Sequence, residues 1–188
     1  MRVAIVWSSP NTDGLTASAK NSIIEGLKKQ NVEIDEIHIN RKKINHCAAC
    51  GNGWGSCRAE GKCALLDDFA GIYQQLVDAD GIVFVSAVYY SGMTEQLKAF
   101  IDRMRRCDAV HNHYLEGKRC ILVACAGGTG RGTLECLHDM ELALTHMNMR
   151  AYDRIPVVRF NSEYMLTALE SAGEQYANCL QNGFDMYY

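Results

Sequence analysis

The stretch Arg2–Thr16, R-V-A-I-V-W-S-S-P-N-T-D-G-L-T, decides the fold of this chain. Val3 to Trp7 form an unbroken apolar run, which is typical of a strand covered on both faces of a sheet. Turn-forming residues follow, and from Leu15 a helical spacing of apolar residues continues to Leu27. A buried strand that leads through a tight turn into a helix predicts the first unit of an open parallel α/β sheet.

The turn that ends this strand has the chemistry of a phosphate site built from neutral donors. A helix N-terminus presents unpaired N–H groups and the positive end of the helix dipole, and both favour a phosphate. The turn lacks the glycine pattern of dinucleotide folds and the G-K-[ST] of triphosphate loops. Instead Ser9, Thr12 and Thr16 offer hydroxyls without a lysine or arginine, which favours the terminal phosphate of flavin mononucleotide (FMN). The alternative is a polar loop that only caps the helix.

Length, charge and cysteine content narrow the class of protein. The chain has 188 residues, which favours a single domain over residues 1–188, and its net charge of −3 argues against a nucleic-acid partner. No apolar run reaches membrane-spanning length, so no membrane partner is expected. A strand stands where a signal peptide would need a basic start, so we expect a cytoplasmic protein. In a cytoplasmic protein, nine cysteines indicate metal binding or redox chemistry rather than disulfides.

Apolar runs and helical patterns alternate along the rest of the chain. Strands are expected at residues 3–7, 32–39, 81–85, 120–125 and 155–158, and helices at 15–27, 69–76, 93–104, 134–147 and 165–180. The second strand is the more polar one, as an edge position allows. The alternation predicts a doubly wound, five-stranded parallel sheet in a three-layer α/β/α domain with the flavodoxin-like strand order 2-1-3-4-5.

Two further loops should meet the first turn at one edge of this sheet. In that strand order a ligand binds beyond the carboxyl ends of the first, third and fourth strands. The loop at residues 86–92, S-A-V-Y-Y-S-G, offers Tyr89, Tyr90 and backbone donors to a flat ring, unless these tyrosines pack under the next helix. The loop at residues 126–132, A-G-G-T-G-R-G, has four glycines that let the backbone approach a ring closely.

Four segments in order and spacing carry a resemblance to a known family. They are Ser9 to Thr16, Ser86 to Gly92, Gln96 to Arg103, and the cysteine segment from Cys47 to Cys63 that leads into Asp67-Asp68. Together they resemble the flavodoxin-like NAD(P)H-dependent FMN reductases, near the iron–sulfur flavoprotein branch. The resemblance covers nearly the whole chain and is weakest after Asp153.

This resemblance assigns the FMN site residue by residue. The phosphate falls to Ser9, Asn11, Gly14, Leu15 and Thr16. The isoalloxazine ring falls to Ala87, Val88, Tyr89, Tyr90, Ser91 and Gly92, with Ala126, Gly127 and Gly128 at its far edge. The chain departs from the family at three of these positions, where a basic residue, an asparagine and a proline are common in place of Asn11, Leu15 and Ala87.

The resemblance also implies a reaction. A reduced nicotinamide passes hydride to N5 of the flavin, and an electron acceptor then takes its place: a quinone, a flavin, an azo or nitro compound, a metal ion or a redox protein. No catalytic side chain is expected, because the cofactor carries the chemistry. The alternative is an iron–sulfur flavoprotein that exchanges single electrons with a protein partner such as ferredoxin. A homodimer or tetramer is expected, with Trp54 and Tyr187-Tyr188 as exposed aromatic surface.

The cysteine segment is an expected insertion loop at residues 46–64. Cys47, Cys50, Cys57 and Cys63 have the spacing C-x2-C-x6-C-x5-C. Four thiolates in one irregular segment can enclose a [4Fe–4S] cluster or a tetrahedral zinc, or can remain free of metal. In the metal-free case the segment is a wall of the substrate pocket, where Trp54 can stack on an aromatic acceptor.

Other polar and sulfur-containing residues receive structural interpretations. Asp102 and Arg103 are expected to form a local ion pair on a solvated helix face, with direct contact to the substrate as the alternative. His111 and His113 have no matching ligands in the sequence and are expected in a polar loop. The remaining cysteines are expected to be small buried apolar residues: Cys107, Cys120, Cys125, Cys136 and Cys179.

Overall fold

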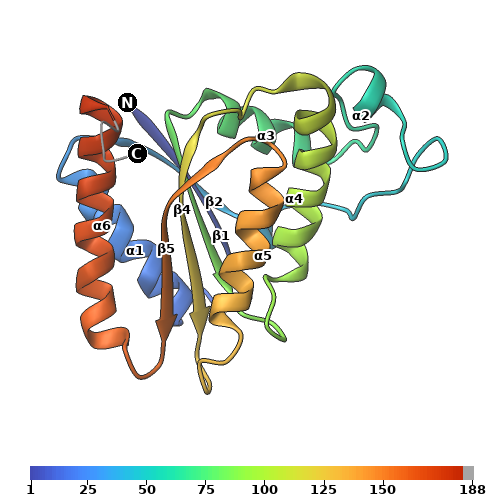
Figure 1. The fold of residues 1–188 in the computed structure, drawn as a ribbon. Coiled ribbons are helices and arrows are strands. Elements are labelled where there is room, and N and C mark those ends of the chain that lie inside the picture. The colour runs from blue at the N-terminus through green and yellow to red at the C-terminus, as the bar shows by residue number, and fades with distance from the viewer. Residues whose placement is uncertain (184–188) are drawn as a thin grey trace.

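The computed structural model describes residues 1–183, and these form a five-stranded parallel sheet with helices on both faces (Figure 1). The strands lie in the order β2-β1-β3-β4-β5. The predicted flavodoxin-like order and three-layer architecture are therefore confirmed. The strand bounds are β1 Arg2–Ser8, β2 Glu33–His38, β3 Gly81–Ala87, β4 Arg119–Ala126 and β5 Arg150–Val158.

The connections between strands are mainly helical. The helix bounds are α1 Leu15–Lys28, α2 Ser56–Ala59, α3 Phe69–Asp78, α4 Glu95–Cys107, α5 Thr133–Thr145 and α6 Ser162–Asn182. A 3-10 turn follows β2 at Ile39–Arg41, and a π-helical turn follows α4 at Asp108–Asn112. Among the helices of residues 1–183, none combines the length and apolarity that crossing a bilayer requires.

Three elements differ from the sequence prediction, each for a local reason. The four-residue α2 was not expected, because it is too short to show a helical period. β5 starts at Arg150, ahead of the predicted start at 155, because the first half of this edge strand is polar and shows no apolar run. α4 starts at Glu95 because the Thr94 hydroxyl accepts a hydrogen bond from the N–H of Leu97 (3.4 Å) and caps the helix.

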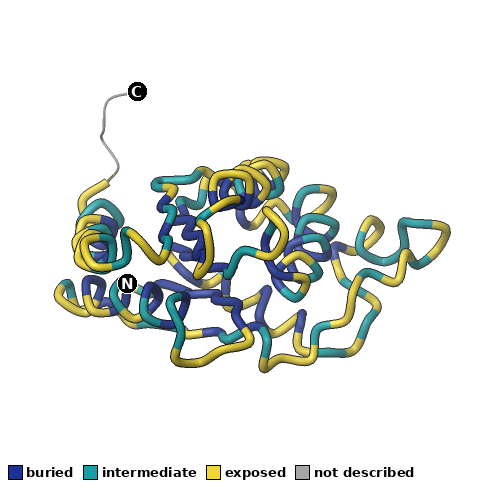
Figure 2. Tube along the Cα trace, turned by 90° about the horizontal axis from the view of Figure 1, so that it is seen from below, coloured by how far each residue is buried: buried dark blue, intermediate teal, exposed yellow. Residues whose placement is uncertain are grey.

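The two faces of the sheet bury separate cores. Val3 and Ile5 of β1 pack with α1 and α6, and Ala4 and Val6 pack with α3, α4 and α5. All four side chains are fully buried, as a strand covered on both sides requires. Figure 2 shows these buried strands between helices whose outer surfaces are exposed.

The α1 and α6 helices approach each other closely enough to require glycine. A Cβ atom on Gly26 would lie 1.9 Å from the carbonyl oxygen of Glu170, and one on Gly173 would lie 2.5 Å from that of Ile23. Backbone therefore packs directly on backbone at this contact, and neither position has room for a side chain.

Helix α4 joins two distant parts of the molecule. Its N-cap residue, Thr94, is fully buried beside the carboxyl ends of β1 and β3, and the helix ends at Cys107. Its 13 residues span about 20 Å at 1.5 Å per residue. The cysteine segment packs against the last turns of α4, so it lies far from the carboxyl edge of the sheet (Figure 1).

Candidate functional site

The three loops that the sequence assigned to a flavin meet at one edge of the sheet. Because β1, β3 and β4 are adjacent and parallel, their carboxyl ends coincide: Ser8 pairs with Ser86, and Ala87 pairs with Cys125. The loops at 9–14, 88–94 and 127–132 therefore open on the same side, as the strand order predicts.

The first of these loops ends in a helix N-terminus that lacks a side-chain cap. Gly14 is the N-cap residue of α1, and no side chain within residues 1–183 makes a cap hydrogen bond there. The first turn of α1 contains no acidic residue. Ser9 and Thr16 lie buried on either side of the turn. The alternative of a polar loop that caps the helix is therefore wrong, and the first N–H groups of α1 are available to an anion.

His38, which the sequence analysis did not single out, holds the start of this turn. Its Nε2 lies 2.9 Å from the carbonyl oxygen of Ser9, and its ring stacks on Trp7 with 3.7 Å between centroids. Glu36 accepts a hydrogen bond from Nε1 of the Trp7 indole (3.0 Å). The signal that could have found His38 is strand register, because β1 and β2 pair Trp7 with His38 in parallel.

A buried hydroxyl network joins the first loop to the second. Ser8, Ser86 and Thr94 are all fully buried. The hydroxyls of Ser8 and Thr94 are hydrogen-bonded to each other, and the Thr94 N–H donates to Oγ of Ser86 (3.2 Å). Ser8 also donates to Oδ1 of Asn40 (2.8 Å). Such satisfied buried networks fix the relative position of the segments that they connect.

The second loop is a tight turn that presents a tyrosine to solvent. Tyr89 and Gly92 exchange both backbone hydrogen bonds (2.8 and 2.9 Å), and Tyr90 and Ser91 have φ values of 46° and 68°. Positive φ at both central residues is the geometry of a type I′ turn, which is costly for residues other than glycine. The Tyr90 side chain is fully exposed and that of Tyr89 is 38% exposed. The alternative that both tyrosines pack under α4 is therefore wrong.

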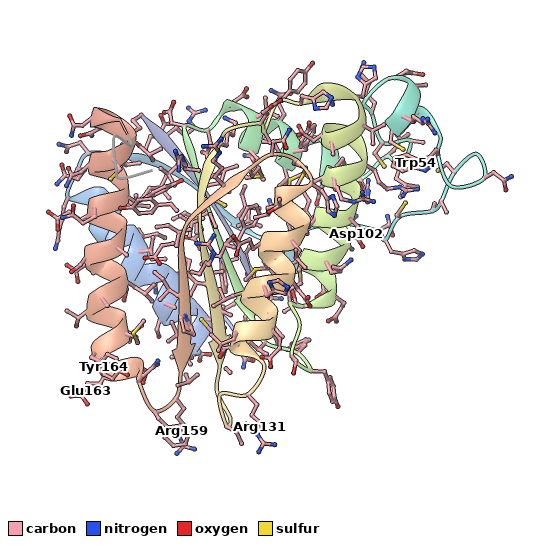
Figure 3. The ribbon with its side chains drawn as sticks, viewed as in Figure 1. Trp54, Asp102, Arg131, Arg159, Glu163 and Tyr164 are labelled. Atoms are coloured by element: carbon pink, nitrogen blue, oxygen red, sulfur yellow. The ribbon has the colours of Figure 1, made fainter. Side chains whose placement is uncertain are left out.

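The second and third loops together form a hollow of about 300 Å³. Val88, Tyr90 and Ser91 line it from one side, and residues 126–131 line it from the other. Gly132 has φ +84°, and a Cβ atom there would lie 2.5 Å from Cα of Ser91, so glycine is needed where these loops touch. Arg131 at the rim was not predicted as a site residue. Figure 3 places it with Arg159 at this edge of the sheet.

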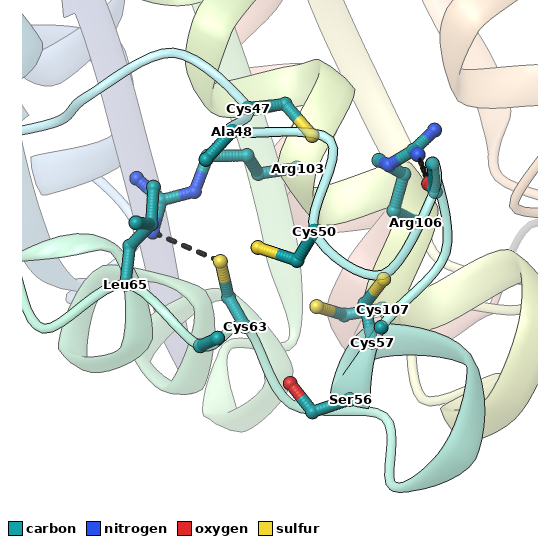
Figure 4. A pocket seen from close by; sticks show the side chains of 13 residues that line it. Cys47, Ala48, Cys50, Ser56, Cys57, Cys63, Leu65, Arg103, Arg106 and Cys107 are labelled. Carbon is teal, nitrogen blue, oxygen red and sulfur yellow. Dashed lines mark hydrogen bonds between the residues drawn. The ribbon is translucent and has the colours of Figure 1, made fainter.

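The cysteine segment forms a second candidate site. Cys47, Cys50, Cys57 and Cys63 all line one cavity, as Figure 4 shows. Within the described chain a further thiol, that of Cys107 on α4, lines the same cavity and was predicted only as a core residue. In residues 1–183 no three His, Cys, Asp or Glu side chains converge closely enough to hold a single metal ion. The space between the thiols is about 20 Å³, so a cluster requires this irregular segment to open.

Arg103 connects the cysteine segment to α4. Its side chain is 1% exposed, and its guanidinium donates to both carboxylate oxygens of Asp67 (2.7 and 2.8 Å). It also donates to the carbonyl oxygen of Asn45 (3.0 Å) and to Sγ of Cys63 (3.2 Å). Arg103 thereby holds both ends of the cysteine segment against the helix, and a bidentate pair of this kind is geometrically specific.

The predicted ion pair between Asp102 and Arg103 is wrong. Asp102 is paired with Lys98 at 2.6 Å on the exposed face of α4, whereas Arg103 is buried against Asp67. Neighbouring residues on a helix point about 100° apart, so two successive charges face different surroundings.

The surroundings of Asp67 strongly favour its charged form. Burial by itself raises the pKa of this carboxyl group, but hydrogen bonds from Arg103 and from the backbone N–H groups of Asn45 and Phe69 outweigh burial. The charge of Arg103 acts in the same direction, so the pKa of Asp67 lies well below its usual range. The pair is therefore ionised at neutral pH.

A second arginine lines the cysteine cavity. The guanidinium of Arg106 lies 4.2 Å from the ring centroid of Trp54 and is hydrogen-bonded to the carbonyl oxygen of Gly53. The Nε atoms of Arg103 and Arg106 are buried and have no hydrogen-bond partner among residues 1–183. The cavity is thus lined by thiols and by two arginines, and each arginine has a buried Nε–H group without a hydrogen-bond partner in the described residues.

The other cysteines follow the expectation with one exception. Cys107, Cys120, Cys125 and Cys136 are buried, whereas Cys179 is half-buried and its Sγ lies 3.5 Å from the hydroxyl of Tyr152. Burial raises the pKa of the Cys120, Cys125 and Cys136 thiols to about 12. These thiols are therefore protonated and act as packing groups.

Comparison with known proteins decides the family. The profile of the NADPH-dependent FMN reductase family matches residues 1–160 of the chain. The chain belongs to this family. Relatives of this FMN reductase family member include an iron–sulfur flavoprotein of Archaeoglobus fulgidus, 30% identical over 70% of this chain and 57% of the relative. Two iron–sulfur flavoproteins of Methanocaldococcus jannaschii are each 32% identical, one over 74% of this chain and 70% of the relative, the other over 56% and 52%.

The extent of these matches differs between relatives and solved structures. The chain spans little more than half the length of the first two relatives. A solved flavone reductase aligns with this FMN reductase family member at a TM-score of 0.79 and 15% identity, over 100% of this chain and 66% of the other. An archaeal flavodoxin aligns at 0.66 and 16% identity, over 97% of this chain and 100% of the other. These structures share the fold.

Proposed function

We propose that the chain is an FMN-dependent oxidoreductase that takes hydride from NADH or NADPH and passes electrons to an acceptor. The observation that carries this proposal is the uncapped N-terminus of α1, which lies beside the hollow between the second and third loops. A helix N-terminus of this kind suits a phosphate monoester, and the hollow suits a flat ring. Family membership supports the same conclusion.

Each predicted site residue has a role in this proposal. The backbone N–H groups from Gly14 to Thr16 and the side chains of Ser9 and Asn11 would bind the FMN phosphate. The turn at residues 87–92 would hold one side of the isoalloxazine ring, and residues 126–128 would hold its far edge. When bound, FMN supplies reversible hydride acceptance at N5. The protein supplies the position of the ring and shields its buried side from water.

The experiment that tests this proposal is a titration of the purified chain with FMN. A Cβ atom at Gly14 would meet only Asn11, at 3.6 Å, so Gly14→Val disturbs the fold little but places methyl groups where the phosphate would approach. We expect Gly14→Val to abolish FMN binding and Thr16→Ala to weaken it by about 0.5–1.5 kcal/mol, the range for one hydrogen bond. Thr145→Ala, on the exposed end of α5, is the matched control.

Two results would contradict the flavin proposal. One is release of FAD, or of no flavin, when the purified protein is denatured. The other is unchanged FMN affinity in Gly14→Val. A bound flavin that NADH and NADPH both fail to reduce without oxygen would leave FMN binding intact and refute the enzymatic part.

A second candidate function is electron transfer through a [4Fe–4S] cluster on Cys47, Cys50, Cys57 and Cys63. It is favoured by the single cavity that these four thiols line and by the hydrogen bond from Arg103 to Cys63. When bound, such a cluster supplies one-electron exchange, which a protein partner such as ferredoxin requires. The two arginines would offset the negative charge of four thiolates, and their unpaired Nε–H groups could donate to sulfur.

The test of the cluster is anaerobic reconstitution with iron and sulfide. We expect about four irons and four sulfides per chain, with broad visible absorption that Cys50→Ala removes and the half-buried control Cys179→Ala retains. Neither variant should change FMN binding. Failure to retain iron and sulfide in the unmodified protein would refute the cluster and leave the flavin proposal intact.

We also propose that the chain forms a homodimer or tetramer in which the cysteine segment of one copy faces the flavin edge of another. About 17 Å of helix separates Glu95 at the flavin edge from Arg106 at the cysteine cavity, so the two candidate sites of one chain are not adjacent. Tyr187-Tyr188, predicted as part of an interface, lie outside the described residues. A light-scattering mass near 20.9 kDa at micromolar concentration would refute this assembly.

Two broader predictions complete the proposal. The chain over residues 1–188 would be a single domain with an insertion at 46–64, which the shared sheet of residues 1–183 supports. It would act in the cytoplasm without nucleic-acid or membrane partners.

A further inference from the structure

A hollow of about 440 Å³ lies next to the cysteine cavity, and the flavin and cluster proposals do not use it. The end of the cysteine segment, helix α3 and the residues after α4 form its walls. Among its lining residues are Lys62, Cys63, Phe69, Tyr73, His111 and Tyr114. Cys63 lines both this hollow and the cysteine cavity. The volume lies within the range of about 300–1,000 Å³ that is usual for small-molecule sites.

The lining of this hollow combines flat apolar surfaces with hydrogen-bond donors. The rings of Phe69 and Tyr73 are nearly parallel, at 9°, with 5.9 Å between centroids, and these residues are 1% and 8% exposed, so they form the closed base of the hollow. Tyr114 is 57% exposed at the rim. Lys62 supplies an ammonium donor and Glu60 supplies one carboxylate, whereas Nδ1 of His111 lies 3.1 Å from Oδ1 of Asn112. An exposed aromatic ring at the rim beside an ammonium donor suits a planar ring that carries an anionic or carbonyl oxygen.

Hydrogen bonds hold the wall of the hollow in one arrangement. Tyr73 donates from its hydroxyl to Oδ1 of Asp108 (2.6 Å), and Asp108 is fully buried. Asn112 donates from Nδ2 to the carbonyl oxygen of Gly61 (2.8 Å) and to the Tyr73 hydroxyl (3.4 Å). A wall that is already ordered loses little entropy when a ligand binds.

The backbone of this region is specialised as well. Gly61 has φ +67°, and a Cβ atom there would lie 1.9 Å from Oδ1 of Asn112, so only glycine fits against the wall. His111 and Asn112 belong to the π-helical turn Asp108–Asn112. Such turns are rare and occur frequently at functional sites.

We propose that this hollow binds a small planar aromatic compound with an anionic or carbonyl oxygen at one edge. The ring lies against Tyr114 at the rim, and the oxygen accepts a hydrogen bond from Lys62. The site lies at the end of α4 opposite the flavin edge, so a ligand there does not compete with FMN. Binding at this hollow does not depend on the proposed oxidoreductase function.

Isothermal titration calorimetry with anthraquinone-2-sulfonate tests this proposal. The probe is flat and anionic, and its fused rings leave no free quinone carbon for thiols to attack. The full chain is titrated in excess FMN and again without FMN. The test variants are Lys62→Gln and Tyr114→Ser, whose side chains are exposed and whose loss leaves the core intact. The controls are Lys42→Gln, an exposed lysine elsewhere, and Tyr90→Ser at the flavin edge.

We expect saturable binding both with and without FMN. Each test variant should weaken it about fivefold to tenfold, as loss of one charge-assisted or aromatic contact predicts. Both controls should keep the affinity of the unmodified protein. Absence of saturable binding, equal affinity in all variants, or weakening by Tyr90→Ser alone would overturn the proposal. Because the probe is also titrated without FMN, failure of the flavin proposal would not obscure the result.

Discussion

Replacing Asp67 by asparagine tests the ion pair that holds the cysteine segment to α4. The side chains of Asp67 and Arg103 are 4% and 1% exposed, so Asp67→Asn leaves the Arg103 charge buried without a counter-charge. An amide nitrogen at the Oδ2 position would face the donors of Arg103 and Asn45, which hydrogen-bond to that atom at 2.7 and 2.9 Å. Breaking a buried pair from one side costs about 3–5 kcal/mol. We expect Asp67→Asn to reduce the free energy of unfolding by that amount.

The measurement is urea unfolding followed by tryptophan fluorescence and circular dichroism. Asp102→Asn is the matched control, because it removes a carboxylate from the same region that forms only an exposed pair with Lys98. An exposed pair of this kind contributes about 0–1 kcal/mol. A loss below about 1 kcal/mol in Asp67→Asn, or an equal loss in the control, would refute the reasoning.

The pH dependence of stability provides an independent check of the same pair. Because the folded-state pKa of Asp67 is depressed, the stability from this carboxylate is fully present above its unfolded pKa of about 3.9. It is lost progressively as pH falls through that value towards the folded-state pKa. Asp67→Asn should therefore lose less stability than the unmodified protein between pH 5 and pH 3, by about 1 kcal/mol in total, with most of the difference below pH 4. Identical acid-unfolding curves would contradict an ionised, buried Asp67.

The remaining predictions concern the flavin edge and the helix packing. His38→Ala should weaken FMN binding by about 0.5–1.5 kcal/mol, since it frees the carbonyl of Ser9; unchanged affinity would exclude His38 as a positioning residue. Thr94→Ala should lower the free energy of unfolding by about 1–2 kcal/mol in urea, because it removes both the cap of α4 and the bond to Ser8. Gly26→Val should unfold the chain at clearly lower urea concentrations, because a side chain there meets the α6 backbone; wild-type stability would contradict that packing.

Local sequence determined the architecture and the position of the flavin edge. The apolar runs at 3–7, 81–85 and 120–125 predicted buried strands, because each is short, shows no polar alternation and is followed by turn-forming residues. Once these strands are parallel and adjacent, their carboxyl ends must meet, so the turns at 9–14 and 86–92 come together without further information. The cysteine spacing likewise identified the four thiols that line one cavity.

Tertiary structure decided what lies around those segments. The partner of Arg103 is Asp67, 36 residues away, and the partner of the Ser9 carbonyl is His38, 29 residues away. Cys107 joins the cysteine cavity from α4, and the length of that helix separates the two candidate sites. The spacing of apolar residues and the residue types of a turn depend only on residues that are close in the chain, so they can be read from the sequence. Contacts between distant segments depend on how helices pack on the sheet, and that packing exists only in the folded chain.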